Sequence, residues 1–432
     1  MATARTDALG RLRVLAARHD CLPPDQSDAY AIAHELAHAL RPGDEPDRGR
    51  PCRGQRRVEA DLVAHWVLTE LGIASRPPFA ASAPWGGPDV GDRVVRLGEA
   101  IVRHVRAPSR SVLADAQEFF LACARVGWVP AYLAGRGFGV RVQRRWQIGW
   151  APPEAGALTA RLRDLGHPDE SIVAAGLARR GRGGRLRDVF RDRATFPLRT
   201  ADGTIAGFIG RRADGGRGPK YLNSPSSELF HKSELLFGLY ESRGPLARGA
   251  RPVLVEGPLD AVAVALTGRP AVATCGVAFT PGQLAALSAA ADLDRTGLLV
   301  AFDGDASGLR AARRVWRVTR ASDSPRPVHG PLDHVQLPAG TDPAGLLADG
   351  GRPALREALR SPRPLLDLVV DDALDRSLDT VESRLAAARA VAAAIALGRP
   401  NDSARQVVRV ASRLQIPPSL MTEILTDTIS PP

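Results

Sequence analysis

Four short apolar segments between residues 252 and 338 constrain the fold of this 432-residue chain more than any other feature. Each is bounded by Gly or Pro and is followed by a stretch rich in Ala and Leu that is long enough for a helix. Strands that alternate with helices in this way are typical of βα units on a parallel sheet. The sequence therefore predicts a parallel α/β sheet in this part of the chain.

Acidic residues stand where the predicted strands end. Glu256 follows one strand, and Asp303 and Asp305 follow another. Asp342 comes shortly after a further strand. In open α/β sheets the carboxyl ends of the strands form the edge where ligands bind. Carboxylates gathered there without a basic residue need a divalent cation to offset their repulsion, and oxygen ligands suit Mg²⁺ or Mn²⁺.

The spacing of these residues resembles the Toprim domain of primases, topoisomerases and related nucleases. The matching marks are Glu256 after one strand and Asp303-x-Asp305 after a later one, and Asp260 and Gly308 match as well. A Rossmann-like sheet whose carboxylates bind a ribose is an alternative, but no Gly-x-Gly-x-x-Gly follows a strand here. An Asp-x-Asp phosphatase fold is a second alternative, but its nucleophilic motif belongs near the start of the domain.

Segments on the amino-terminal side of the acidic region resemble the polymerase core of DnaG-type primases. They include YLAGRGF, WQIGWAPP and GPKYLNSPSSELFHKSELLFGLYES, so the resemblance runs from about residue 112 to about residue 350. It implies a nucleotidyltransferase that makes short RNA primers on single-stranded DNA from ribonucleoside triphosphates. By this resemblance, the residues expected to hold Mg²⁺ or Mn²⁺ are the catalytic Glu256, Asp303 and Asp305, supported by Asp260 and Asp342.

Lysine is rare in this chain. Lys220 and Lys232 are the only two, and arginine supplies the remaining positive charge. Their closeness in the sequence indicates a phosphate-binding surface that uses a compact ammonium rather than a planar guanidinium. The resemblance implies a basic ridge for template and nucleotide, made of Arg199, Arg211, Lys220, Tyr221, Asn223 and Lys232. The net charge of +11 also suits a polyanionic partner.

The chain departs from the DnaG pattern in three respects. It has no CxxC spacing for a zinc ribbon, and some 70 helix-prone residues follow residue 362, too few for a large helicase-docking domain. Ala344 stands where a second acidic residue is usual after Asp342-Pro343. A replicative helicase is therefore left open as a partner, as is full metal occupancy.

A second motif lies near the amino terminus, where His34-Glu35-Leu36-Ala37-His38 forms an HExxH. On a helix this spacing puts both imidazoles on one face, where they can bind Zn²⁺ while Glu35 polarises a metal-bound water. A second helix offers Glu59 as third ligand, with Asp61 and His65 nearby. The arrangement resembles zincin-like peptidase domains of the ImmA/IrrE type and those of ArdC antirestriction proteins. The alternative is an ordinary amphipathic helix.

The predicted architecture is a multidomain α/β and α+β protein. We expect a zincin-like module with its linker (1–110), the amino-terminal part of a primase core (111–245), a Toprim domain (246–350) and a short helical segment (351–432). No signal peptide or long apolar run is evident, and four scattered cysteines give no disulfide framework, so we expect a cytoplasmic protein.

The domain pairing suggests a primase for a mobile element or phage. The alternatives are a metallopeptidase or antirestriction protein with a DNA-targeting Toprim module, and a non-catalytic nucleic-acid-binding remnant.

Overall fold

The computed structural model divides the chain into two units, residues 1–112 with 162–172, and residues 113–161 with 173–432. A few residues before position 24 are described, together with 28–40, 54–75, 89–106, 108–181, 183–225, 232–276, 278–320, 327–375 and 378–429. Within these residues, no helix is both long and apolar enough to cross a membrane.

In the described part of the first unit, α2 (Ala29–Ala39), α3 (Gly54–Glu70) and α4 (Asp89–Arg106) pack around an apolar core. Buried side chains recur every three or four residues in α2 and α3, so each helix turns one face to the shared core. A side chain at Gly98 would collide with the ring of Trp66, so the glycine lets α3 and α4 pack closely.

A four-stranded antiparallel sheet forms the first part of the second unit. Its strands lie in the order β1 (Gly149–Ala151), β4 (Arg193–Arg199), β5 (Ile205–Arg212) and β6 (Tyr221–Asn223). All seven residues of β4 are buried. The other elements between residues 108 and 247 are α5 (Pro108–Ala124), α6 (Val129–Gly135), α7 (Val140–Arg145), α8 (Ala157–Asp164), α9 (Asp169–Ala174), β2 (Ala178–Arg180), β3 (Leu186–Asp188) and α10 (Leu239–Ala247).

A five-stranded sheet follows, and it confirms the predicted parallel α/β architecture. Its order is β11 (Arg363–Pro364), β10 (Leu332–His334), β9 (Leu298–Val300), β7 (Val253–Val255) and β8 (Ala271–Ala273). All neighbours are parallel except β11, which pairs antiparallel with β10. The strand β10 begins at Leu332, which is buried and pairs with Leu298 of β9.

Side chains of the parallel sheet alternate between two apolar cores. Val253 and Val255 enter one core, and Leu254 between them enters the other. The first core includes residues of α11 (Pro258–Ala265) and α15 (Pro343–Ala358). The second includes residues of α12 (Pro281–Ala290), α13 (Leu293–Thr296), α14 (Ala306–Arg320) and α16 (Leu365–Leu374). The sheet is therefore covered by helices on both faces, which leaves the ends of its strands as the accessible edge.

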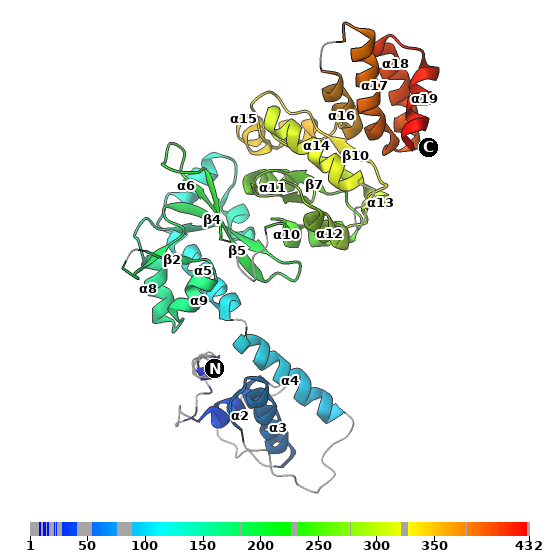
Figure 1. Ribbon diagram of the computed structural model, residues 1–432. Helices are drawn as coiled ribbons and strands as arrows, with labels where there is room; N and C mark the ends of the chain where they lie inside the picture. Colours follow the sequence, from blue (N-terminus) through cyan, green and yellow to red (C-terminus); the bar gives the residue numbers. More distant parts are fainter. Residues whose placement is uncertain are drawn as a thin grey trace. The chain divides into compact units, whose positions relative to one another are not determined.

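Three further helices complete the described chain. They are α17 (Val381–Ala396), α18 (Pro400–Leu414) and α19 (Pro418–Ile429), which lie beside one another (Figure 1). Their buried residues belong to the same core as α14 and α16. Ion pairs from Arg405 to Asp367 and from Arg409 to Asp371 also join α18 to α16.

Candidate functional site

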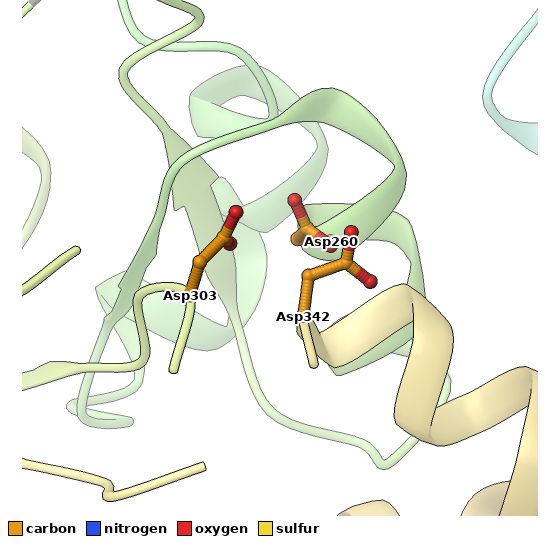
Figure 2. A group of neighbouring side chains, drawn as sticks. All are labelled: Asp260, Asp303 and Asp342. Carbon is orange, nitrogen blue, oxygen red and sulfur yellow. The ribbon is translucent and has the colours of Figure 1, made fainter. Parts of the chain in front are cut away.

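Acidic side chains from separate elements of the second unit meet at the carboxyl ends of the parallel strands. Asp260 comes from the first turn of α11, Asp303 follows β9, and Asp342 caps α15. Figure 2 shows the three carboxylates converging, and one ligand oxygen of each lies within 4.8 Å of the others. Glu256 follows β7 and accepts a 3.4 Å hydrogen bond from the backbone N–H of Asp303. The parallel topology thus gathers residues that are far apart in the sequence.

Asp303 is the carboxylate least satisfied by the protein. Its Oδ1 atom is buried and has no hydrogen-bond partner among the described residues. Burial, followed by the charges of Glu256, Asp342 and Asp305, raises the pKa of Asp303 to about 7, while Lys220 lowers it. Burial likewise raises the pKa of Glu256. Both groups are placed where a bound cation would stabilise their ionised forms.

Asp260 has a different environment, because backbone donors occupy both of its oxygens. Oδ2 accepts from the N–H of Gly257 and Oδ1 accepts from the N–H of Ala344, each at 3.1 Å. Gly257 is next to Glu256, and Ala344 lies two residues after Asp342, so Asp260 ties together the turns that carry those acids. Burial and the charge of Asp342 raise the pKa of Asp260 well above its usual range.

Asp305 and Asp342 are anchored at the starts of helices. Asp305 accepts from the N–H of Ser307 at 2.8 Å, from its hydroxyl at 2.7 Å and from the N–H of Gly308 at 2.9 Å. These donors lower the pKa of Asp305. Asp342 caps α15 by accepting from the N–H of Gly345. Each side chain is thereby oriented by its own helix, and Asp305 stays ionised at neutral pH.

The donor set fits a hard divalent cation. All five acidic residues offer oxygen ligands, and three of them form the one group in the described part of the chain whose atoms are close enough to share an ion. The unpartnered oxygen of Asp303 and the raised pKa values of Asp303 and Glu256 indicate unrelieved negative charge. Carboxylate oxygens of this kind suit Mg²⁺ or Mn²⁺ better than softer metals.

A basic segment borders these carboxylates. Lys220 is exposed, and its charge lowers the pKa of Asp303. Its Nζ atom lies 5.9 Å from the centre of the Tyr221 ring. Burial, and next the charge of Asp260, raise the pKa of Tyr221, so its phenol stays protonated. Lys220 and Tyr221 therefore stand at the acidic edge of the parallel sheet.

Asn223 and Lys232 are fixed to the loops around the same edge. Asn223 donates from Nδ2 to the carbonyl of Cys275 at 2.9 Å, and its Oδ1 is buried without a partner among the described residues. The backbone N–H of Cys275 donates to the carbonyl of Glu256. Lys232 is half-buried, and its carbonyl accepts from Gln283 at 3.1 Å. The amide of Asn223 is thus joined to the strand end that carries Glu256.

Arg211 lies behind this exposed segment. Its side chain is 2% exposed, and it donates to Asp214 at 2.9 Å and faces the Tyr132 ring at 4.8 Å. Arg136, which the sequence pattern did not single out, donates to Tyr132 and to the same Asp214. The available signal was the YLAGRGF segment, which contains both Tyr132 and Arg136. The two arginines form one network whose charge Asp214 offsets in part.

Arg199 is enclosed by polar partners. It pairs with Glu241 at 2.7 Å, with both side chains less than 10% exposed, and it also bonds to Gln147. The guanidinium of Arg199 is therefore buried and bonded to protein side chains, whereas Lys220 is exposed. Of the six residues predicted for the basic ridge, Lys220, Tyr221 and Asn223 lie at the acidic edge, and Lys232 is half-buried on a neighbouring loop. Arg199 forms a buried pair with Glu241, and the buried Arg211 pairs with the exposed Asp214.

In the first unit, α2 places its two histidines side by side, with their rings edge to face. The Nε2 atoms of His34 and His38 are 3.2 Å apart. The Nδ1 atom of His34 lies 2.8 Å from a carboxylate oxygen of Asp61 on α3. Burial, and next a hydrogen bond to Asp61, raise the pKa of Tyr30 to about 12. Asp61 thus orients the ring of His34 and leaves its other nitrogen turned toward His38.

The predicted third ligand does not join this pair. The Oε1 atom of Glu59 accepts from Arg93 on α4 at 2.9 Å and from Gln55 at 3.1 Å. Within the described residues, no group of three that includes the histidines has its ligand atoms within 4.8 Å of one another. Glu35 is exposed. The His65 Nδ1 atom lies 3.1 Å from the Ser75 hydroxyl.

Two family models match the second unit. Residues 122–243 match the "DNA primase catalytic core, N-terminal domain", and residues 253–333 match a "Toprim-like" domain. A DNA primase of Mycobacterium tuberculosis is 36% identical over 265 residues, which is 60% of this chain. The alignment covers 40% of that primase, so the chain spans well under two thirds of the curated relative.

Solved structures match most of the second unit. The RNA polymerase domain of Mycobacterium tuberculosis primase DnaG superposes with a TM-score of 0.61 at 30% identity, covering 71% of this chain and 99% of that one. A DnaG primase catalytic domain bound to single-stranded DNA superposes with a TM-score of 0.62 at 28% identity, covering 74% of this chain and 99% of that one. These matches agree with the fold of the two sheets described above.

Proposed function

We propose a primer-synthesis function for this chain, which belongs to the family of DnaG-type DNA primases. The proposed reaction joins ribonucleoside triphosphates into short RNA on a single-stranded DNA template. The observation that supports it most is the convergence of Asp260, Asp303 and Asp342 beside Lys220. A negative site for divalent cations next to an exposed ammonium suits a substrate that carries both phosphates and metal.

In this proposal Glu256, Asp303 and Asp305 hold Mg²⁺ or Mn²⁺, with Asp342 nearby. When bound, the cations supply activation of a 3′-hydroxyl and stabilisation of the entering and leaving oxygens. Asp260 is proposed to act chiefly by orienting the turns that carry Glu256 and Asp342, since both of its oxygens accept backbone hydrogen bonds.

Lys220 is proposed to neutralise phosphate oxygens of the nucleotide or template, and the half-buried Lys232 to support it. The Oδ1 atom of Asn223, which has no hydrogen-bond partner among the described residues, adds a directional acceptor at the same edge. A cavity of about 820 Å³ beside Asp303 and Asp305 reaches α16 and α18, and its volume suits a nucleotide-sized ligand. The relative bound to single-stranded DNA supports the choice of template. The ribonucleotide substrates and a helicase partner rest on the family alone.

A primer-synthesis assay tests this function. Purified protein is incubated with single-stranded DNA, ribonucleotides and Mg²⁺ or Mn²⁺, and RNA products are resolved by length. We expect short RNA from the wild type and from Asp349→Ala, an exposed control on α15, and none from Asp303→Ala. Equal product from the wild type and Asp303→Ala would overturn the assignment. No product from any of them would favour a nucleic-acid-binding remnant.

We also propose that the first unit carries a zincin-like Zn²⁺ site, because of the distance between its two histidines. Two nitrogens bound to one tetrahedral zinc at about 2.0–2.1 Å are about 3.3 Å apart. The 3.2 Å between the Nε2 atoms of His34 and His38 matches that separation, and Asp61 supports His34 from behind. Glu59 would complete the site by exchanging its bond to Arg93 for the metal, and Glu35 would act as the base in a peptidase reaction.

Metal analysis tests this second site. Protein purified without chelators should contain about one zinc per chain, as should His329→Ala, which removes an exposed histidine of the other unit. His34→Ala should lose the metal. If the wild-type protein neither contains nor takes up zinc, the zinc-site proposal is wrong and α2 is an ordinary amphipathic helix. Zinc binding without peptide hydrolysis would limit the proposal to a structural site.

A further inference from the structure

Arg193 is a buried cation beneath the loop that presents Lys220. It is the first residue of β4 and is 7% exposed. Burial, and next the charge of Arg212, lower the pKa of Arg193. Among the described residues no carboxylate lies within ion-pair distance of it. A guanidinium in such a place costs stability unless its N–H groups are well satisfied.

The guanidinium is satisfied by backbone carbonyls. Nη1 donates to the carbonyl of Gly210 at 3.0 Å and more weakly to that of Lys220 at 3.4 Å. Nη2 donates to the carbonyl of Pro219 at 3.0 Å. Two of these three acceptors are consecutive residues at the end of the loop that joins β5 to β6. The planar fork therefore fixes the backbone just before and at Lys220.

The sequence around Arg193 makes room for this interaction. A Cβ atom at Gly210 would lie 2.9 Å from Cδ of Arg193 and 2.6 Å from the Phe190 ring, so a glycine is required where the stem passes. Gly218 precedes the two bonded carbonyls and has a φ of +84°, which a residue with a side chain rarely adopts. The loop thus turns directly over the guanidinium and then enters β6 at Tyr221.

We infer that Arg193 is a positioning residue, which holds the carbonyls of Pro219 and Lys220 so that the Lys220 ammonium stays beside the acidic edge. The inference rests on the proposed role of Lys220 in binding phosphates. Arg193 itself pairs with none of the described carboxylates of that edge. It acts by reducing the freedom of the loop, so the ammonium is held near Asp303 before nucleic acid arrives.

The test compares Arg193→Met and Arg193→Lys with Lys220→Ala and with the double variant Arg193→Met/Lys220→Ala. Affinity for a single-stranded DNA oligonucleotide is measured at fixed low salt, and hydrogen exchange is followed at the amides of residues 213–222. Arg320→Met is the matched control, since Arg320 is also buried and also donates to carbonyls, those of Val328 and Gly330.

Arg193→Met should speed exchange in the loop and weaken DNA binding by roughly tenfold, because the loop that presents Lys220 must then be ordered when DNA binds. Because Arg193 acts through Lys220, the double variant should bind no more than about twofold more weakly than Lys220→Ala. Arg193→Lys should recover only part of the affinity, since the compact ammonium lacks the planar, pre-organised fork of the guanidinium. Arg320→Met should lower the melting temperature without changing either readout.

Two results would overturn the inference. One is unchanged loop exchange in Arg193→Met, and the other is an effect of Arg193→Met that is undiminished in the Lys220→Ala background. Wild-type affinity in Lys220→Ala would instead count against the proposed role of Lys220, and the exchange data would still show whether Arg193 orders the loop. If Arg193→Met does not fold, Arg193→Lys supplies the same comparisons.

Discussion

Two regions of the molecule bring together side chains that can bind a metal: the acidic edge of the second unit and the histidine pair of the first. They differ in how far apart in the sequence those side chains lie. Asp260, Asp303 and Asp342 come from three elements that only the parallel sheet brings together. His34 and His38 come from successive turns of one helix, and no third ligand among the described residues lies close enough to both of them to share an ion. At the first site, burial and then the neighbouring carboxylates disfavour the ionised form of Asp303, whereas at the second a neighbouring carboxylate already orients one ring.

The largest expected effect concerns Glu256, which distinguishes a catalytic acidic edge from a merely acidic surface. Glu256→Gln keeps the shape of the side chain but removes a charge from the proposed cation site. Primer synthesis should fall by about 10³-fold, the effect of several kcal/mol of lost stabilisation. Glu357→Gln, an exposed glutamate of α15, should leave synthesis unchanged. Comparable primer synthesis by Glu256→Gln and Glu357→Gln would mean that the acidic edge is only an acidic surface.

The next effect concerns Asp61, which is proposed to orient His34 rather than to bind metal. Asp61→Asn should lower zinc affinity by about 10–100-fold without abolishing binding. Titration calorimetry with zinc would measure it, with Asp92→Asn, an exposed acid of α4, as the control. Complete loss of zinc in Asp61→Asn, together with full binding in Glu59→Ala, would show that Asp61 is the third ligand.

A smaller effect is expected at Lys220, the exposed cation that accompanies the acidic edge. Lys220→Ala should reduce the dependence of single-stranded DNA affinity on salt by roughly 0.7 log unit per log unit of salt for each phosphate that the lysine neutralises. Lys220→Arg should restore this slope but only part of the primer synthesis. Arg352 is an exposed residue of α15 and serves as the control. If Arg352→Ala changes the salt dependence of DNA affinity as much as Lys220→Ala does, Lys220 has no specific role in binding phosphates.

The smallest expected effect is a pH dependence of stability in metal-free protein. Because the folded pKa of Asp303, about 7, exceeds the usual value for an aspartate, the folded state binds more protons than the unfolded state between about pH 4 and pH 7. Stability contributed at Asp303 therefore falls as the pH rises through this window.

Calorimetry in a chelator should show the second unit melting about 1–3 °C higher at pH 6 than at pH 8. The Asp303→Asn variant should lose most of this difference, and added Mg²⁺ should stabilise the wild type at pH 8. An unchanged pH difference in Asp303→Asn would show that other groups govern it.

Local features of the fold were readable from the sequence. The runs that became β7, β8 and β9 consist of apolar residues bounded by Gly or Pro, which favours buried parallel strands whatever surrounds them. The start of β10 at Leu332 was not readable from the sequence, because the pairing of Leu332 with Leu298 is an interaction between distant segments. Arg136 was missed, since its role depends on Tyr132 and Asp214, and Asp214 lies 78 residues away.

Residue type and spacing also determined which side chains can do chemistry, but not which are free to do it. The sequence by itself placed Glu256, Asp303 and Asp342 at one sheet edge, because parallel strands end on the same side, and it paired His34 with His38 through the helical repeat. Other features were decided only by the tertiary structure. Both oxygens of Asp260 accept hydrogen bonds from backbone N–H groups. Arg199 is buried in a pair with Glu241, and Glu59 pairs with Arg93. The reason is physical: strand order and helical periodicity follow from local pattern, whereas burial and hydrogen-bond partners depend on which distant segments pack together.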